Sequence, residues 1–577
     1  MQMKSLTVRV TVFDDESPPA EGDVVVFAPV RWEDVGIAAA AMLAIGIPFV
    51  AFANLVLFHF YVRGSFVLDS GLLASLMWHG NATLAQPASL GGGSFFGTHV
   101  SLLFLPVLAL SWCLPFSMPQ FFAGFVGFSH ALLALAVFWL LVEGFGLRRG
   151  VGPWIAALAA LGFAFSGLAI AIARYPHFET LIAAFFLLFA VAQVLGHPRL
   201  AVAFFVLGLA TREDAGFHYV AVLGLLVTLN LACGVPLRQQ RTECTFALAA
   251  LFYAIAVLTV QRLLFPETSA FARVYLGDPP LAHLSAGLIA HRMLSFLVGR
   301  PYILYPALGA CIWALRARNP YVVLAFAASI PWVLVHLLAK SPLAGMLVSY
   351  YAFPFLIALA WPLLGVMRQR QWTGKAGDPT SVIVGFGALL ALSFLPGIGL
   401  HDPGQLPLPQ AFWDPPSRAR QAATDRAVAA ISAARPMLGR LLVDNSIAAL
   451  APNGFVQAEV PFLQGNETAP SEATTSPDTV VFFAEGYDAR RLRAIADAAG
   501  LTKRYSMPGT QVHLAARQRL EEIPSLADLV TAEQGDARKW KNPLRRLRRF
   551  RLRAGRSHVF LPNENNPKPS RNSSKVD

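Results

Sequence analysis

Long apolar segments recur along most of the chain, and they constrain its fold more than any other feature. About eleven of them are long enough to cross a bilayer, because a spanning helix needs about 20 apolar residues and satisfies its own backbone hydrogen bonds in lipid. Of the 577 residues, 55% are hydrophobic and only 14% are charged, which is more apolar sequence than one soluble core requires. The sequence therefore predicts an α-helical polytopic membrane protein of about eleven transmembrane helices.

Changes in composition divide the chain into four regions. We expect a cytoplasmic N-terminal segment at 1–35, a transmembrane domain at 36–398 with a long first outer loop at 63–118, an α/β domain at 399–520, and a basic, disordered tail at 521–577. The short connections "GLRRG", "RARNP" and "RQRQWTGK" all fall on one face, which the positive-inside rule assigns to the cytoplasm together with the N-terminus. The small α/β domain is then extracytoplasmic. No cleavable signal peptide is expected, because the first apolar run is too long for one.

Charge, cysteine spacing and missing motifs exclude several classes of protein. The formal net charge is +12, but Lys and Arg concentrate in the connections and the tail, which is typical of membrane topology and not of a nucleic-acid-binding protein. The four cysteines form no CxxC pair, so neither a zinc site nor a disulfide framework is predicted. No Walker A, GxGxxG, HExxH or GxSxG pattern occurs, so no soluble nucleotide cofactor is expected; a divalent cation stays open.

Asp69 follows the first apolar segment, in "GSFVLDSGLLASLMWHG". The predicted topology places it at the outer surface, where a short interfacial helix begins. One interpretation is an N-cap, because an aspartate before an apolar helix accepts hydrogen bonds from free backbone N–H groups. The other is a catalytic base or a substrate ligand.

Further polar residues fall on the same predicted outer face. His99 lies in "GTHVS", and His177 and Glu179 lie in "RYPHFET" between two apolar segments. Arg212, Glu213 and Asp214 interrupt the apolar stretch 199–232, where charges are costly unless paired or hydrated. Two interpretations stay open for this break: an ion pair that stabilises two half-helices, or a polar substrate cavity.

Cationic and aromatic candidates occur later in the chain. Arg292, in a predicted outer loop, and Lys340 lie on a face that usually carries few positive charges, so they are candidate ligands for a phosphate or an anionic headgroup. Tyr350 and Tyr351 are either interfacial aromatic residues or substrate contacts.

The order of these motifs carries a family resemblance. The segments "VLDSGLLASLMWHG", "GTHVSLLFLP", "RYPHFETLIAAFFLL", "LGLATREDAGFHYVAVLGL" and "VSYYAFPFL" resemble those of a bacterial family of predicted polytopic membrane proteins of unknown function, similar in plan to GT-C glycosyltransferases. His177 and Glu179 match the family's Asp-x-His-Pro-Glu pattern, although its first acidic position is Tyr175 here. Arg212, Glu213 and Asp214 match a Lys-Glu-Asp pattern, and Tyr350–Tyr351 match a His-Tyr pair whose His is absent.

The resemblance implies an activity and its partners. GT-C enzymes move a sugar from a polyprenyl-phosphate donor in the membrane to an extracytoplasmic acceptor, which is a glycan, lipid or protein. An acidic residue in their first outer loop acts as the base or as an acceptor ligand, and Asp69 matches its position. The remaining candidates would bind substrate. The implied location is the bacterial cytoplasmic membrane. The alternatives are a transporter or flippase with its site at the broken helix, and a membrane protein without catalytic activity.

Overall fold

The computed structural model describes residues 32–533 except 63, 91, 267–271, 278, 346, 348, 374–377, 396–408, 456–475 and 487. Most of the predicted cytoplasmic segment and the part of the predicted tail from 534 onward lie outside the described residues. The chain divides into a unit that ends at Thr531 and a second unit that begins at Ala532.

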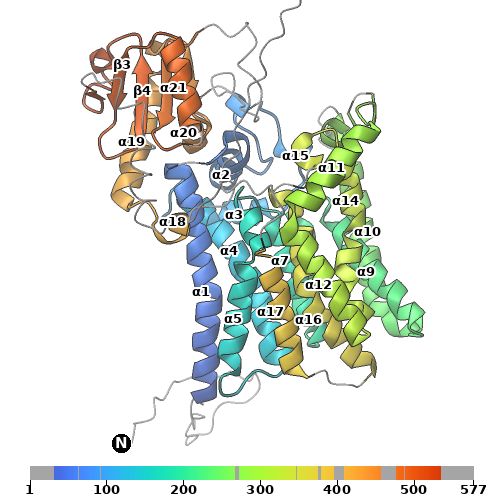
Figure 1. Ribbon diagram of the computed structural model, residues 1–577. Coiled ribbons are helices and arrows are strands. Elements are labelled where there is room, and N and C mark those ends of the chain that lie inside the picture. Colours follow the sequence, from blue (N-terminus) through green and yellow to red (C-terminus); the bar gives the residue numbers. More distant parts are fainter. Residues whose placement is uncertain are drawn as a thin grey trace, which may run out of the picture. The chain divides into compact units, whose positions relative to one another are not determined.

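Two long helices, α1 (Trp32–Tyr61) and α4 (Met118–Trp139), pack along each other, and α4 continues as the π-helical turn η4 (Leu140–Gly144). Figure 1 shows α1 beside α4 and α5. The α1–α4 approach needs a glycine, since a Cβ on Gly127 would lie 2.4 Å from the carbonyl oxygen of Phe49. Small residues at such contacts are typical of helix packing in membranes, where packing replaces the hydrophobic effect as the driving force.

Six helical segments among the described residues are long and apolar enough to cross a membrane, and two bent helix pairs raise the number to eight. The bent pairs are α5 (Gly152–Ala164) with α6 (Gly167–Ala173), and α11 (Ala286–Gly299) with α12 (Pro301–Ala317). The prediction of a helical, multi-pass protein is thus confirmed. The predicted number of about eleven includes three shorter apolar helices, α7 (Thr180–Val194), α8 (Pro198–Thr211) and α17 (Pro379–Leu392).

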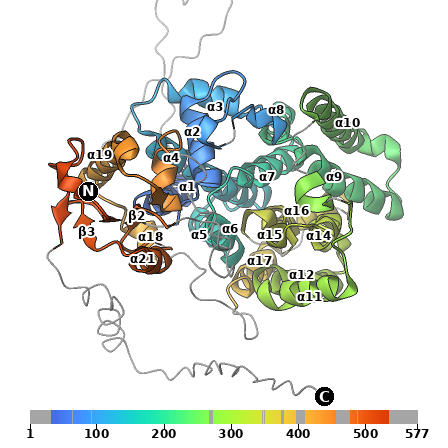
Figure 2. The same ribbon diagram turned by 90° about the horizontal axis from the view of Figure 1, so that it is seen from above.

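Burial separates central from peripheral helices. Nearly every side chain of α7 is buried, and in Figure 2 other helices surround it whereas α10 (Arg241–Leu264) lies at the edge. The side chains of Leu248, Phe252 and Leu263 on α10 are mostly exposed, as expected for a helix that faces lipid. The other helices of this part are α9 (Ala215–Ala232), η8 (Pro320–Val323), α13 (Leu324–Ala328), α14 (Ile330–Leu337), η9 (Ser349–Ala352) and α16 (Pro354–Thr373).

The long loop between α1 and α4 contains a short helix after Asp69, which the sequence predicts, and several further short helical segments. It contains η1 (Val67–Gly71), α2 (Leu72–His79), η2 (Ala88–Leu90), η3 (Phe95–Gly97) and α3 (Phe104–Ser111). Further short elements connect later spans: η5 (Leu237–Gln240), η7 (Ala272–Leu276) and α15 (Pro342–Gly345). The sequence places Arg292 in a loop, which is wrong, because that residue lies within α11.

The region after α17 contains the predicted α/β domain. Its helices are α18 (Pro409–Trp413), α19 (Arg418–Ala434), η10 (Arg435–Met437), α20 (Asn445–Leu450), α21 (Ala489–Ala498) and η12 (Leu520–Glu522). Its strands are β1 (Leu441–Val443), β2 (Thr479–Phe483), β3 (Lys503–Ser506), β4 (Val512–Ala516) and β5 (Thr531–Ala532).

The sheet has the order β1-β2-β4-β3-β5. Strands β1 and β2 pair in parallel, with Leu441 opposite Thr479, and β2 pairs antiparallel with β4, with Val481 opposite Leu514. Strands β3 and β4 form a hairpin that turns at Pro508 and Gly509. The ordered chain extends beyond the predicted boundary at 520, because Leu526 is fully buried and β5 joins the sheet.

Candidate active site

The helix break between α8 and α9 is held by Arg212. This residue has an extended backbone, and its guanidinium is almost completely buried. Its Nε donates to Oδ1 of Asp214 over 2.6 Å, its Nη2 donates to the other oxygen of Asp214, and its Nη1 donates to Glu179 at the start of α7. Burial alone would raise the pKa of Asp214, but the guanidinium outweighs burial and holds that pKa below its usual range. Arg212 thus joins the N-terminal ends of α7 and α9.

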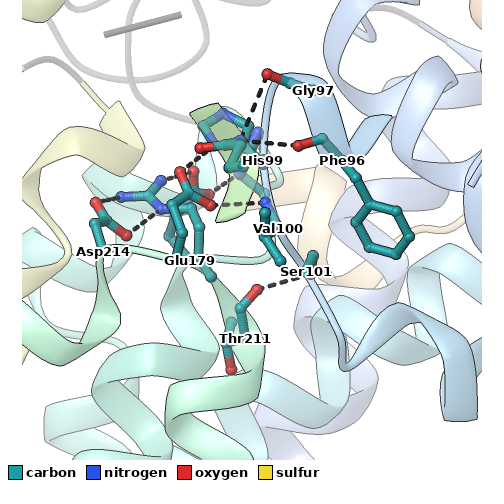
Figure 3. A network of polar contacts seen from close by, with 12 residues as sticks. Phe96, Gly97, His99, Val100, Ser101, Glu179, Thr211 and Asp214 are labelled. Atoms are coloured by element: carbon teal, nitrogen blue, oxygen red, sulfur yellow. Dashed lines mark hydrogen bonds and ion pairs between the residues drawn. The ribbon is translucent and has the colours of Figure 1, made fainter. Parts of the chain in front are cut away.

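Glu213, the third charge of the break, holds the first outer loop. Its Oε2 accepts a hydrogen bond of 2.9 Å from the backbone N–H of Val100, and its Oε1 lies 2.9 Å from Nδ1 of His99 (Figure 3). Nearby, the hydroxyl of Ser101 donates to the carbonyl oxygen of Thr211 over 2.7 Å. On the other side of the loop, the Gln261 amide donates to the carbonyl of Phe96 over 2.9 Å. These contacts bring together His99 and Glu213, two predicted site residues 114 positions apart.

His177 and Glu179 lie in the connection between α6 and α7, where Glu179 meets Arg212. Nδ1 of His177 lies against a carboxylate oxygen of Glu179, and the imidazole stacks on the ring of Tyr350, with centroids 4.3 Å apart. Tyr350 in turn lies against Tyr351, with centroids 4.4 Å apart. Burial, followed by the nearby charges of His99 and Arg212, lowers the pKa of His177, so its ring is neutral at pH 7. A neutral imidazole can accept a proton or a hydrogen bond.

Asp69 lies on η1, at the side of this cluster. Neither η1 nor α2 has a side-chain N-cap, and their N-cap residues are Phe66 and Gly71, so the capping interpretation of Asp69 is wrong. The carboxylate acts electrostatically on the hydroxyls of Tyr350 and Tyr351. In the described part of the chain, no group donates a hydrogen bond to it. Burial raises the pKa of Asp69 to about 6, which makes it a stronger base than an exposed aspartate.

The sequence analysis does not identify four residues of this region, which are His218, Tyr275, Trp332 and His336. Nε2 of His218 lies 3.9 Å from Oδ2 of Asp214, and its ring contacts Trp332 at a centroid distance of 4.6 Å. The indole of Trp332 donates to the carbonyl oxygen of Tyr351 over 2.8 Å. His336 is fully buried and lies 3.3 Å from the hydroxyl of Tyr275. All four lie in or beside apolar segments, so only the spacing of Asp214 and His218, four residues apart on a helix, was available as a signal.

The two cationic candidates differ in their surroundings. Arg292 is 3% exposed, and its Nη1 donates to the carbonyl oxygen of Leu337 over 2.8 Å. Its guanidinium therefore anchors the end of α14. Lys340 is exposed, and its backbone N–H donates to the carbonyl oxygen of Tyr275 over 2.9 Å. This hydrogen bond joins Lys340 to Tyr275. The side chain of Tyr275 acts electrostatically on Arg212.

The arrangement suits acid–base chemistry on a polar substrate. It combines a carboxylate of raised pKa, a neutral imidazole, two tyrosines and an ion-paired network. Exposed fractions of 28% for the His99 side chain and 23% for Asp214 leave parts of it open. Among the described residues, no group of three or more His, Cys, Asp or Glu side chains could hold a metal ion.

Comparison with solved structures finds a structural likeness. The chain is similar to ArnT from Cupriavidus metallidurans bound to undecaprenyl phosphate, with a TM-score of 0.45 and 13% sequence identity over 85% of this chain and 99% of that chain. No family model matches the chain. No curated protein matches it either.

Proposed function

We propose that this protein is a GT-C-like membrane glycosyltransferase that moves a sugar from a polyprenyl-phosphate donor to an extracytoplasmic acceptor. The observation that carries the proposal is the position of Asp69. This residue of the first long loop has no hydrogen-bond donor among the described residues, and burial raises its pKa to about 6. Its carboxylate acts electrostatically on Tyr350 and Tyr351 of η9. The resemblance of the sequence motifs to the GT-C plan supports a base on the same loop.

The proposed reaction is a displacement at the anomeric carbon. Asp69 takes the proton from an acceptor hydroxyl while the oxygen of that hydroxyl bonds to the anomeric carbon. The bond from the anomeric carbon to the phosphate oxygen breaks at the same time. The polyprenyl phosphate leaves with the bonding electron pair. Lys340 is the cation proposed to stabilise this phosphate, because its side chain is exposed whereas the Arg292 guanidinium is buried against backbone carbonyls.

The polar network supplies the proposed contacts to sugar hydroxyls. His177 stacks on Tyr350. Its neighbour Glu179 shares the Arg212 guanidinium with Asp214, and Glu213 of the same helix break contacts His99. Preorganised donors and acceptors of this kind orient a substrate without reorganising during the reaction. No soluble nucleotide would take part, because the donor reaches the site through the membrane.

The setting of this reaction is part of the proposal. The protein would lie in the bacterial cytoplasmic membrane with its N-terminus inside and its α/β domain outside. The full number of spans would be about eleven, with α7, α8 and α17 as short spans. A transporter remains the second candidate, because charged residues at the α8–α9 break are typical of transport sites. The carboxylates of this break are, however, occupied by Arg212, Val100 and His99.

Substitution of the base tests the proposal. Membranes that contain the native protein, Asp69→Asn or the control Asp497→Asn would be incubated with a radiolabelled polyprenyl-phosphate sugar, and the transferred label would be measured. Asp497 is an exposed residue of α21. Loss of a general base lowers such rates about 10²- to 10⁴-fold, so transfer should be lost only in Asp69→Asn. Equal transfer by all three proteins at equal abundance would exclude the assigned role. A substrate gradient formed by proteoliposomes without sugar transfer would favour the transporter.

A further inference from the structure

The α/β domain is attached to the same helices that lead into the Asp69 loop. The hydroxyl of Tyr61 donates to Asp425 on α19 over 3.2 Å, and the amide of Gln120 on α4 donates to Gln421 over 2.9 Å. One hydrophobic core includes Phe60 of α1 and Val443 of β1. Movement of this domain would therefore act on the C-terminal end of α1, which comes just before the loop.

Helix α20 then contacts the loop itself at the end that precedes Asp69. The backbone N–H of Gly64 donates to Oγ of Ser446 over 3.1 Å, and this hydroxyl donates to the carbonyl oxygen of Ser65 over 3.3 Å. Ser446 is buried, and its own N–H donates to Asp444 over 2.8 Å, which fixes its position at the start of α20. One hydroxyl thus ties two consecutive backbone groups of the loop.

The other end of α20 contacts Gly71, the last residue of η1. A Cβ on Gly71 would lie 2.8 Å from Cα of Ala449 and 3.2 Å from its carbonyl oxygen. A Cβ cannot approach backbone atoms so closely, hence only glycine allows this contact. The segment that carries Asp69 is therefore held on both sides, at Gly64–Ser65 and at Gly71, by one short helix.

We propose that α20 of the α/β domain positions the loop of Asp69, with Ser446 as the positioning residue. The domain has then a direct part in transfer, because it sets the place of the carboxylate relative to Tyr350 and Tyr351. The inference rests on the proposed function for the role of Asp69. The contacts of α20 with the loop at Gly64–Ser65 and at Gly71, together called the clamp, are a property of the fold and are measurable without any substrate.

Hydrogen–deuterium exchange of the full-length protein in lipid nanodiscs tests the clamp. Ser446→Ala removes both hydrogen bonds, so exchange at residues 64–71 should rise about tenfold, which corresponds to about 1.4 kcal/mol. Ser446→Thr keeps a hydroxyl and should restore protection. The control Ser525→Ala changes a serine of the same domain for which no described residue is a hydrogen-bond partner, and it should leave residues 64–71 unchanged. Equal exchange in Ser446→Ala and the native protein would overturn the inference.

Kinetics of sugar transfer test the positioning role. Ser446→Ala should lower kcat at least tenfold at an unchanged KM for the donor, since a misplaced base slows chemistry more than binding. A loosened loop with native kcat would overturn this role. If the native protein transfers no sugar, the proposed function fails, whereas the exchange result still decides whether α20 holds the loop.

Discussion

Asp69→Asn should stabilise the protein while it removes the proposed activity. Burial raises the pKa of Asp69 from the usual 3.8 to about 6, so the folded state binds a proton more tightly than the unfolded chain does. Stability contributed by this proton is complete below about pH 4 and is lost as the pH rises through 6. A tenfold difference in proton affinity corresponds to about 1.4 kcal/mol, so the ionised carboxylate lowers the unfolding free energy by up to about 3 kcal/mol at pH 7.

An asparagine carries no charge at any of these pH values. The unfolding free energy of Asp69→Asn should therefore exceed that of the native protein by up to about 3 kcal/mol at pH 7.5 and by less than about 1 kcal/mol at pH 4. Purified proteins in detergent micelles would be unfolded at both pH values. Asp497→Asn serves as the matched control, because the Asp497 side chain is 70% exposed and its replacement should not stabilise the protein.

The same pKa predicts the pH dependence of transfer. A base that ionises near pH 6 should give a rate that rises with pH through about 6 and then levels off. Neutral or lowered stability of Asp69→Asn at pH 7.5, together with a rate that is flat between pH 5 and 7, would refute the reasoning from burial to base.

Three further substitutions test the surroundings. Arg212→Met should lower the unfolding free energy in micelles by about 3–5 kcal/mol, because the carboxylates of Glu179 and Asp214 lose their cation. The double variant Arg212→Met, Glu179→Gln should recover part of this loss. Full stability of Arg212→Met alone would contradict the ion-pair network. Glu213→Gln should keep an acceptor for the loop but lose the charge near His99, so transfer should fall about tenfold with little change in stability, and an unchanged rate would remove Glu213 from the site. Gly127→Ala should destabilise by about 1–3 kcal/mol because its Cβ meets a backbone carbonyl, whereas Gly124→Ala has open space and should not.

The elements that depend on local sequence could be predicted. Apolar runs gave the long helices, and the charges of Arg212, Glu213 and Asp214 gave the break between α8 and α9, because both follow from the cost of polar groups in lipid. The β3–β4 hairpin follows from Pro508 and Gly509 in the same way. Each of these features is encoded within a few residues.

The errors arise where distant segments meet. A capping role for Asp69 was reasonable from its neighbours, but η1 forms a π-helical turn and α2 continues directly from it, so no free helix start falls at that residue. Arg292 falls on α11 because that segment is amphipathic and packs against α14. Trp332 and His336 lie within an apolar run that gives no sign of a site. The tertiary fold brings His336 to Tyr275 and Trp332 to Tyr351.

The clamp of α20 on the Asp69 loop has a consequence for biosynthesis. Ser446 and Ser65 are 381 residues apart, and a ribosome that adds about 5–20 residues per second needs roughly 20–80 s to cover that distance. During this interval the loop is already synthesised but lacks the helix that holds it. The proposed centre is therefore completed only after α20 has been synthesised, so a chain cut short before β1 should insert its early helices but lack the contacts that hold the Asp69 loop.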